Sequence, residues 1–225
     1  MATIESPTVS TQVMEVDRLH AAARVSIRPL DHESAEGIIL GHYRAFGQTS
    51  AIAPNAGVVL GLARWTDTSR FAVITRVYTC LTVVTAVTAQ RTDPLLLLPT
   101  RGYTVAETTN VTAVNIGGNN AKNRVNMGTA LMSSVSVASN AAGMTGGTKT
   151  NDATPIGAVA FGPAAIAALG TGIAVQDLYR YDKLAEHPFV LSANEGLLLT
   201  WGTTTLATGT VTVGFGIDWA EVAAY

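Results

Sequence analysis

Residues 210–219, TVTVGFGIDW, alternate without interruption between apolar side chains and small or polar ones. This period of two is typical of a β-strand that is buried on one face. The buried face would carry Val211, Val213, Phe215, Ile217 and Trp219. On the other face, Gly214 and Gly216 leave room for a close neighbour. We therefore expect a second sheet, a loop or another subunit to contact these glycines.

Other segments rich in β-branched and aromatic residues predict further strands, because Gly, Pro and Asn separate them. The longest, residues 71–89, exceeds a typical strand, so we expect a bulge, a bend or a change of sheet within it. Shorter strands are expected in residues 24–30, 37–46, 57–65 and 133–139, and a pair joined by a turn in 187–201. The sequence thus predicts an all-β fold, a single β-sandwich of jelly-roll type with long loops.

The remaining segments define the expected domain organisation. Residues 1–22 lack a clear period and predict an N-terminal arm, which leaves residues 23–225 as the sandwich domain. Residues 100–154 are rich in Gly and Asn, so we expect mostly long loops there. Residues 155–175 are uncharged, but Gly and Pro163 interrupt them. A buried strand followed by one short helix at 163–169 is therefore favoured over a membrane span.

The composition indicates a protein that assembles with partners. The 225 residues are 48% hydrophobic and only 13% charged, so the surface is poor in charge. The 14 basic residues form no stripe and the formal net charge is -2, which argues against a nucleic-acid partner. The single Cys80 excludes an internal disulfide, and its β-branched surroundings indicate a small buried hydrophobe.

The sequence contains no complete motif for catalysis, cofactor binding or metal binding. Residues 32–36 begin like a zinc-protease HExxH motif but end in Glu, and residues 146–150 place Thr148 between the Gly and Lys of a phosphate-binding loop. The remaining candidates are carboxylates isolated in the sequence: Glu107, Asp152, Asp177, Glu195 and Asp218. They would act as a glycosidase pair only if the fold brought two of them together. We therefore expect no catalytic, cofactor or metal site, and no enzyme.

Several stretches carry a resemblance to a known family. They are HAAARVSIRPLD with GHYR, RWTDTSRFAVITRV, NNAKNRVNMGTAL with ASNAAGMTGGTKTNDA, and HPFVLSANEG with IDWAEVAAY. Together they resemble a family of proteins encoded among the structural genes of tailed bacteriophages. The resemblance covers most of the chain from about His20 onward. It implies a virion component, a β-sandwich attached to the capsid shell or tail.

The leading hypothesis for function is a capsid decoration or cement subunit, made in the host cytoplasm and located in the virion. The arm and the loops 115–128 and 140–155 would contact the major capsid protein or other virion proteins. A symmetric homo-oligomer is expected, with a trimer as the working assumption. Neither nucleic acid nor a membrane is an expected partner.

The alternative hypothesis is a tail or fibre component that binds a host receptor or glycan by stacking it on exposed aromatic rings. The core-facing position of Trp219 argues against a platform of Trp65, Trp201 and Trp219. It leaves Tyr43 and Tyr103 as candidates. A depolymerase built on a carboxylate pair is a third and weaker hypothesis.

Overall fold

The computed structural model describes residues 15–17, 22–24, 41–88, 93–161, 172–181 and 187–223. The chain divides into two units, Met1–His32 and Glu33–Tyr225. The first unit contains an antiparallel pair of short strands, β1 (Glu15–Asp17) and β2 (Ala22–Arg24). Most of the predicted arm, the predicted strand beyond Arg24, the HExxH-like segment 32–36 and the predicted helix at 163–169 lie outside the described residues.

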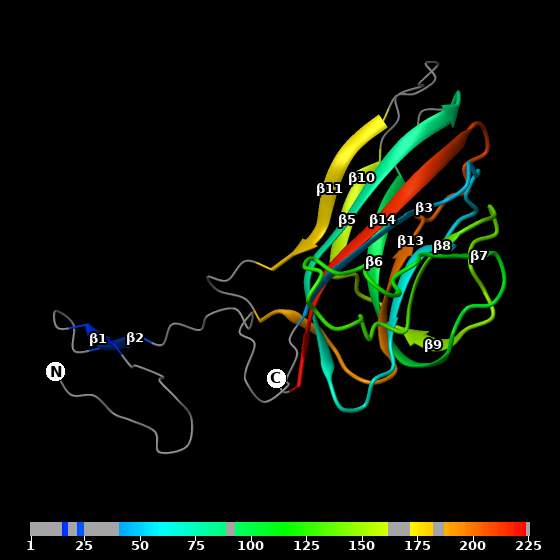
Figure 1. Ribbon diagram of the computed structural model, residues 1–225. Helices are drawn as coiled ribbons and strands as arrows, with labels where there is room; N and C mark the ends of the chain where they lie inside the picture. The colour runs from blue at the N-terminus through cyan, green and yellow to red at the C-terminus, as the bar shows by residue number, and fades with distance from the viewer. Residues whose placement is uncertain are drawn as a thin grey trace. The chain divides into compact units, whose positions relative to one another are not determined.

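The second unit is a sandwich of two antiparallel sheets (Figure 1). The five-stranded sheet has the order β11 (Gly172–Arg180), β5 (Phe71–Thr85), β14 (Thr210–Val222) and β3 (His42–Gln48), and β12 (Phe189–Leu191) also pairs with β5. The seven-stranded sheet has the order β10 (Gly157–Phe161), β6 (Asp93–Val105), β13 (Glu195–Thr200), β4 (Val59–Trp65), β8 (Ser134–Ala138) and β7 (Val111–Ala113), with β9 (Thr148–Asn151) also on β6. The described residues form no helix. The predicted all-β sandwich is confirmed.

The connectivity of the sandwich is that of a jelly roll. Strand pairs are nested along the chain: β3 pairs with β14, β4 with β13, β5 with β11, and β6 with β10. Such nesting results when one long antiparallel hairpin rolls up, so that its strands are shared between two sheets. The members of each of the first three pairs therefore lie far apart in the sequence.

Residues 106–156 form an insertion between β6 and β10, and it is less irregular than expected. The strand predicted at 133–139 is present as β8, which pairs with both β4 and β7. The expectation of loops was wrong for residues 100–105, which continue β6, and for β7 and β9. The Gly- and Asn-rich sequence around these short strands favours loops, but β9 is held extended by ladder hydrogen bonds with β6, and β7 by those with β8.

Strand β5 contains the expected irregularity. Asp218 lies opposite Arg76 and Trp219 lies opposite Ile74, so Thr75 is an extra residue in β5. Before this bulge Ala72 and Ile74 are buried, and after it the buried positions are the odd-numbered ones from Val77 onward. The bulge thus determines which side chains of β5 reach the outer face of the sheet.

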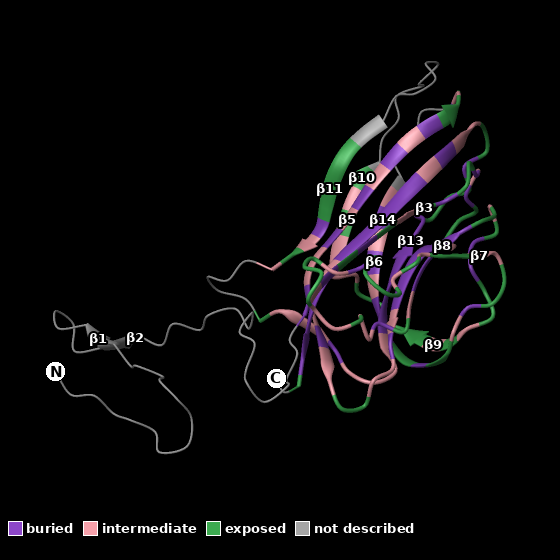
Figure 2. Cartoon of the chain, viewed as in Figure 1, coloured by how far each residue is buried: buried purple, intermediate pink, exposed green. Residues whose placement is uncertain are grey.

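The core lies between the two sheets, and β14 is central to it (Figure 2). The predicted apolar face of β14 is confirmed, since all five of its members are buried: Val211, Val213, Phe215, Ile217 and Trp219. Gly61 of β4 admits the ring of Phe215, because a Cβ atom there would lie 2.5 Å from Phe215 Cγ. The missing side chain allows the two sheets to pack closely at this point.

One predicted strand and one predicted turn are present but lie in surroundings other than those expected. Residues 157–161 form β10 at the edge of a sheet, and residues 157–160 are half-buried or exposed rather than buried. The turn predicted between residues 187 and 201 is present, with Asn194 at φ 61°. However, β12 and β13 belong to different sheets, so this turn is a corner of the sandwich and not a hairpin.

Candidate functional site

The outer face of the five-stranded sheet, which is turned away from the other sheet, presents side chains from three neighbouring strands. Phe46 comes from β3 and Tyr78 from β5, while β14 contributes Gly214 and Gly216 between them. In the ladder, Gly216 lies opposite Phe46 on one side and opposite Tyr78 on the other. Two aromatic residues therefore flank a strand that has no side chains of its own at these positions.

The two glycines allow the aromatic rings to lie close over β14. A Cβ atom at Gly214 would be 2.8 Å from Cζ of Phe46, and one at Gly216 would overlap the ring of Tyr78. The rings are parallel to within 7°, and their centroids are 6.1 Å apart. Other groups do approach these glycines closely, as expected, but the prediction that they come from a second sheet, a loop or another subunit was wrong. They are side chains of the adjacent strands in the same sheet, whose rings cover the space that the glycines leave.

A row of alternating charges lies beside the aromatic pair. Asp218 is opposite Arg44 of β3 and Arg76 of β5. Nε of Arg76 also lies 2.6 Å from Oδ1 of Asp177, and its guanidinium carbon is 4.6 Å from the ring centroid of Tyr78. Burial raises the pKa of Asp218, while the charges of Arg76 and Arg44 act in the opposite direction. Each carboxylate in this row thus has an arginine beside it.

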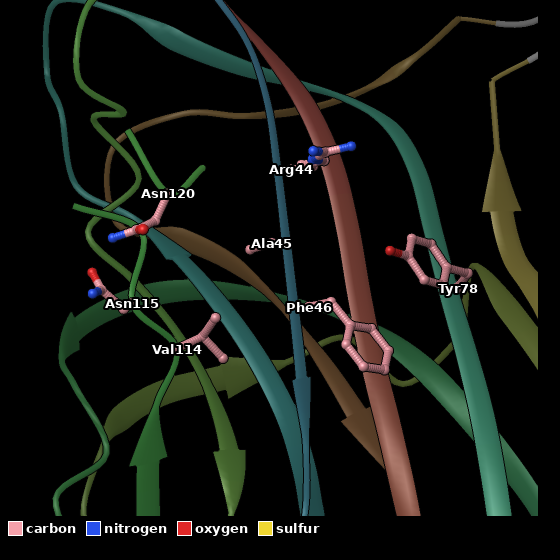
Figure 3. A pocket seen from close by; sticks show the side chains of 7 residues that line it. All are labelled: Arg44, Ala45, Phe46, Tyr78, Val114, Asn115 and Asn120. Carbon is pink, nitrogen blue, oxygen red and sulfur yellow. The ribbon is translucent and has the colours of Figure 1, made fainter. Parts of the chain in front are cut away.

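A hollow of about 230 Å³ opens on this face, where β3 meets the segment that follows β7. Its walls come from the sheet on one side and from the insertion on the other, and the lining residues are Arg44, Ala45, Phe46, Tyr78, Val114, Asn115 and Asn120 (Figure 3). Oδ1 of Asn115 accepts a hydrogen bond from the Gly117 N–H, and Nδ2 of Asn120 donates one to the Gly117 carbonyl. These bonds fix both amide groups at the rim of the hollow.

The predicted contact loop 115–128 is held against the free edge of β3. The Arg44 N–H donates to the Ala121 carbonyl at 2.8 Å, and the Asn123 N–H donates to the His42 carbonyl at 3.2 Å. Beyond this anchor the loop exposes Val125, which is 79% accessible. The loop is therefore anchored to β3 and exposes one valine among the exposed polar residues Asn123, Arg124 and Asn126.

The predicted contact loop 140–155 is ordered by β9 and by a buried ion pair. The side chain of Glu107 is fully buried, accepts a hydrogen bond from the Gly147 N–H at 2.5 Å, and pairs with Lys149. The ammonium group of Lys149 also lies 5.3 Å from the ring centroid of Tyr103. Because Lys149 neutralises a buried carboxylate, the segment 146–150 has a structural role and its lysine is not available to a phosphate.

The other candidate carboxylates lie beside arginines. Arg101 lies 3.1 Å from Asp152 and 3.5 Å from Glu195. Arg76 forms an ion pair with Asp177 and lies opposite Asp218 in the ladder. In the described part of the chain, no group of three or more His, Cys, Asp or Glu side chains could hold a metal ion. The arginines give these carboxylates structural partners.

The aromatic residues singled out in the sequence do not form a binding platform. The candidates are all at most 1% exposed: Trp65, Trp201, Trp219, Tyr43 and Tyr103. The expectation for Cys80 was also wrong, since this residue is half-buried and its sulfur lies over Gly214 on the outer face. The bulge at Thr75 explains this, because it shifts the even-numbered residues that follow it to the outer side.

The residues that do line the hollow carried unequal signals in the sequence. Alternation in residues 42–48 places Arg44 and Phe46 on the face opposite Tyr43, so the sequence pattern of β3 indicates that Phe46 lies on the outer face. Tyr78 carries no such signal, because the bulge changes the phase of β5. The importance of Asn115 and Asn120 depends on the docking of the insertion against β3, which no local pattern indicates.

Comparisons with protein-family models, with curated proteins and with solved structures found no match to this chain. Among the described residues, no helix has the length and apolar character needed to cross a membrane.

Proposed function

We propose that this chain is a virion structural protein of a tailed bacteriophage, a decoration subunit that binds and stabilises the capsid shell. The resemblance of its sequence to phage structural proteins supports this proposal. The jelly-roll sandwich supports it by analogy, since viral capsid domains use the same architecture. The low charge of the chain fits a subunit whose surface is largely covered after assembly.

The observation that carries the proposal is the loop 115–128. It belongs to the single insertion between β6 and β10 and is anchored to β3 by backbone hydrogen bonds. The loop exposes Val125. An ordered loop loses little conformational entropy on binding and can bury its exposed valine in a neighbouring subunit. The same insertion contains the second contact region, 140–155, and the proposed partner of both loops is the major capsid protein or another virion protein.

The mechanism would be mechanical. Loops from the insertion, together with the N-terminal arm, would bridge neighbouring capsomers and bury apolar surface at the joints between them. A homo-oligomer of this chain, with a trimer as the working assumption, would bridge several capsomers at once. Synthesis in the host cytoplasm followed by incorporation into the virion is the location that this role requires.

Copy number in purified virions tests the proposal directly. Quantitative mass spectrometry should find hundreds of copies of the chain in each particle. The alternative, a tail or fibre component that binds a host receptor, predicts a few dozen copies or fewer. A low copy number would therefore contradict the decoration role.

A substitution in the loop tests the proposed contact. Val125→Asp should weaken binding of the purified protein to capsids that lack it by at least about tenfold, because a charge would be buried at an apolar contact. The matched control is Val175→Asp on β11, an exposed valine 53% accessible and outside the insertion. Equal binding by both variants would exclude the loop as the contact.

A further inference from the structure

We propose that the hollow between Phe46, Tyr78 and the segment 114–120 is a binding site for a saccharide, which holds one pyranose ring of an oligosaccharide or polysaccharide. This site lies on the outer face of the five-stranded sheet. It shares Asn115 and Asn120 with the proposed contact loop 115–128, but its aromatic residues, Phe46 and Tyr78, lie outside that loop. The inference goes beyond the decoration role and does not depend on it.

The aromatic rings supply the apolar part of such a site. Phe46 is 47% exposed, which is unusual for a phenylalanine on a sheet face. Glycines beneath the rings allow them to lie low over β14 as a pair parallel to within 7°. Pyranose rings have C–H groups on their faces, and these groups pack against aromatic rings with gains from dispersion and from the negative charge of the ring face.

The amide groups at the rim supply the polar part. Asn115 uses its Oδ1 to accept from Gly117, so its Nδ2 remains to donate. Asn120 uses its Nδ2 to donate to Gly117, so its Oδ1 remains to accept. A sugar hydroxyl is both a donor and an acceptor, and it can therefore satisfy both amides. Arg44 also lines the hollow.

The site is organised before any ligand binds. The Asn120 N–H donates to the Gly117 carbonyl at 3.2 Å, which closes a tight turn that ends at Asn120, and Asn115 is bonded to the start of this turn through the Gly117 N–H. The turn is joined to the sheet because Arg44, itself a lining residue, donates its backbone N–H to Ala121. A site held in this way loses little side-chain entropy on binding, so weak individual contacts can add up to a measurable affinity.

The size of the hollow favours a small polar ring over other ligands. At about 230 Å³ it is smaller than the roughly 300–1,000 Å³ of pockets that enclose drug-sized molecules or cofactors. One of its lining side chains, Phe46, is also 47% exposed to solvent. A long chain can therefore place one ring in the hollow while its neighbours lie along the sheet.

The test is a binding measurement on the full-length protein with defined probes. We would titrate cellohexaose, maltohexaose, chitohexaose, dextran and purified host surface polysaccharide by isothermal titration calorimetry. We expect at least one probe to bind, and Phe46→Ala to weaken that binding at least about tenfold, as removal of a central aromatic anchor does. The matched control is Val84→Ala, an exposed valine 37% accessible on the same sheet and outside the hollow, which should bind normally.

A second variant separates loss of the site from loss of the fold. Phe46→Trp keeps an aromatic surface and should retain binding. The three native tryptophans are buried, so the new exposed indole should report the saccharide directly by a change in fluorescence. Failure of every probe to bind the wild-type protein would overturn the proposal, as would wild-type affinity in Phe46→Ala. Capsid binding by Phe46→Ala is expected to be normal, so the saccharide site and the decoration role can fail independently.

Discussion

At the scale of single residues, glycines decide how closely neighbouring groups approach in this sandwich. Gly61 and Gly216 both face an aromatic ring, but the two rings differ in freedom. Phe215 is fully buried between the sheets, whereas Tyr78 is half-buried on the outer face and can move toward solvent. The same missing Cβ atom therefore has different consequences at the two sites.

Alanine substitutions at the two glycines should separate these cases. Gly61→Ala should destabilise the fold by about 1–3 kcal/mol, because Phe215 has no space to move. Gly216→Ala should change stability by less than about 1 kcal/mol, since Tyr78 can swing outward and alanine restricts the unfolded chain. Urea unfolding followed by tryptophan fluorescence would measure both. A larger loss at Gly216 would show that the outer ring is as fixed as the inner one.

Glu221 is a buried carboxylate near the end of β14. Its Oε1 accepts hydrogen bonds from the Leu131 N–H at 2.7 Å and from Nε1 of Trp219 at 3.0 Å. Burial raises the pKa of Glu221 even though these hydrogen bonds act to lower it. The folded state therefore binds this proton more tightly than the unfolded state. Its contribution to stability is complete below the unfolded-state pKa and is lost as the pH rises through the folded-state pKa.

Replacing Glu221 by Gln should make this contribution independent of pH. The amide keeps an oxygen acceptor for Leu131 and Trp219 but has no proton to lose. As the pH is raised from about 4 to about 7, the wild type should lose the contribution of Glu221 and the Gln variant should not. The free energy of unfolding of Glu221→Gln should therefore increase relative to that of the wild type with rising pH. Urea titrations at several pH values would measure the difference. Asp218, whose pKa is also raised, contributes equally to both proteins and cancels. Parallel pH profiles would contradict the assignment.

At the scale of elements, the bulge at Thr75 links the core to the outer face. Even-numbered residues of β5, Ala72 and Ile74, are buried before the bulge, and odd-numbered ones, from Val77 onward, are buried after it. The extra residue makes this change possible within one strand. The hydroxyl of Thr75 donates to the carbonyl of Asp218 at 3.1 Å and holds the extra residue in place. If Thr75 occupied a regular position in the ladder, one half of β5 would have its side chains on the wrong face.

Deletion of Thr75 tests the role of the bulge. Because Thr75 is the extra residue, its removal leaves Ala72, Ile74 and Val77 in unbroken alternation on the core face, so stability should change by less than about 1 kcal/mol. Deletion of Tyr78, in the regular part of the strand, should instead put one half of β5 on the wrong face and destabilise the protein by roughly 3 kcal/mol. Thermal unfolding followed by circular dichroism would compare the two. Equal stability would mean that β5 absorbs the change elsewhere.

At the scale of the whole molecule, nested pairing makes the sandwich depend on its last strand. β14 follows all other strands in the chain, yet it lies between β5 and β3 in the middle of its sheet. Its apolar face completes the core between the sheets. Because the strands that it joins are distant in sequence, the five-stranded sheet cannot close until β14 is in place.

Truncation tests this dependence. A chain that ends at Gly209 should show no cooperative unfolding and a red-shifted emission from Trp65 and Trp201, because their core is left open. Removal of residues 1–32, which form a separate unit, should leave cooperative unfolding intact. A cooperative transition in the chain that lacks β14 would show that the other strands form a stable core without it.

The local pattern of the sequence determined the strands and the buried face of β14. Alternation of side chains follows from backbone geometry within one strand, so Val211 to Trp219 could be assigned to the core without knowledge of any neighbour. The density of strands and turns then indicated a sandwich. The unusual length of residues 71–89 indicated an irregularity, although it did not place the irregularity at Thr75.

Only the tertiary structure decided what surrounds these strands. The rings of Phe46 and Tyr78 meet over Gly216 because β3 and β5 both pair with β14. Cys80 faces outward because the bulge at Thr75, earlier in the same strand, changes which residues face the core. Lys149 of β9 forms an ion pair with Glu107, which follows β6. Pairing between distant strands depends on the packing of the whole core, so no local pattern contains it, and the candidate site exists only where such pairings meet.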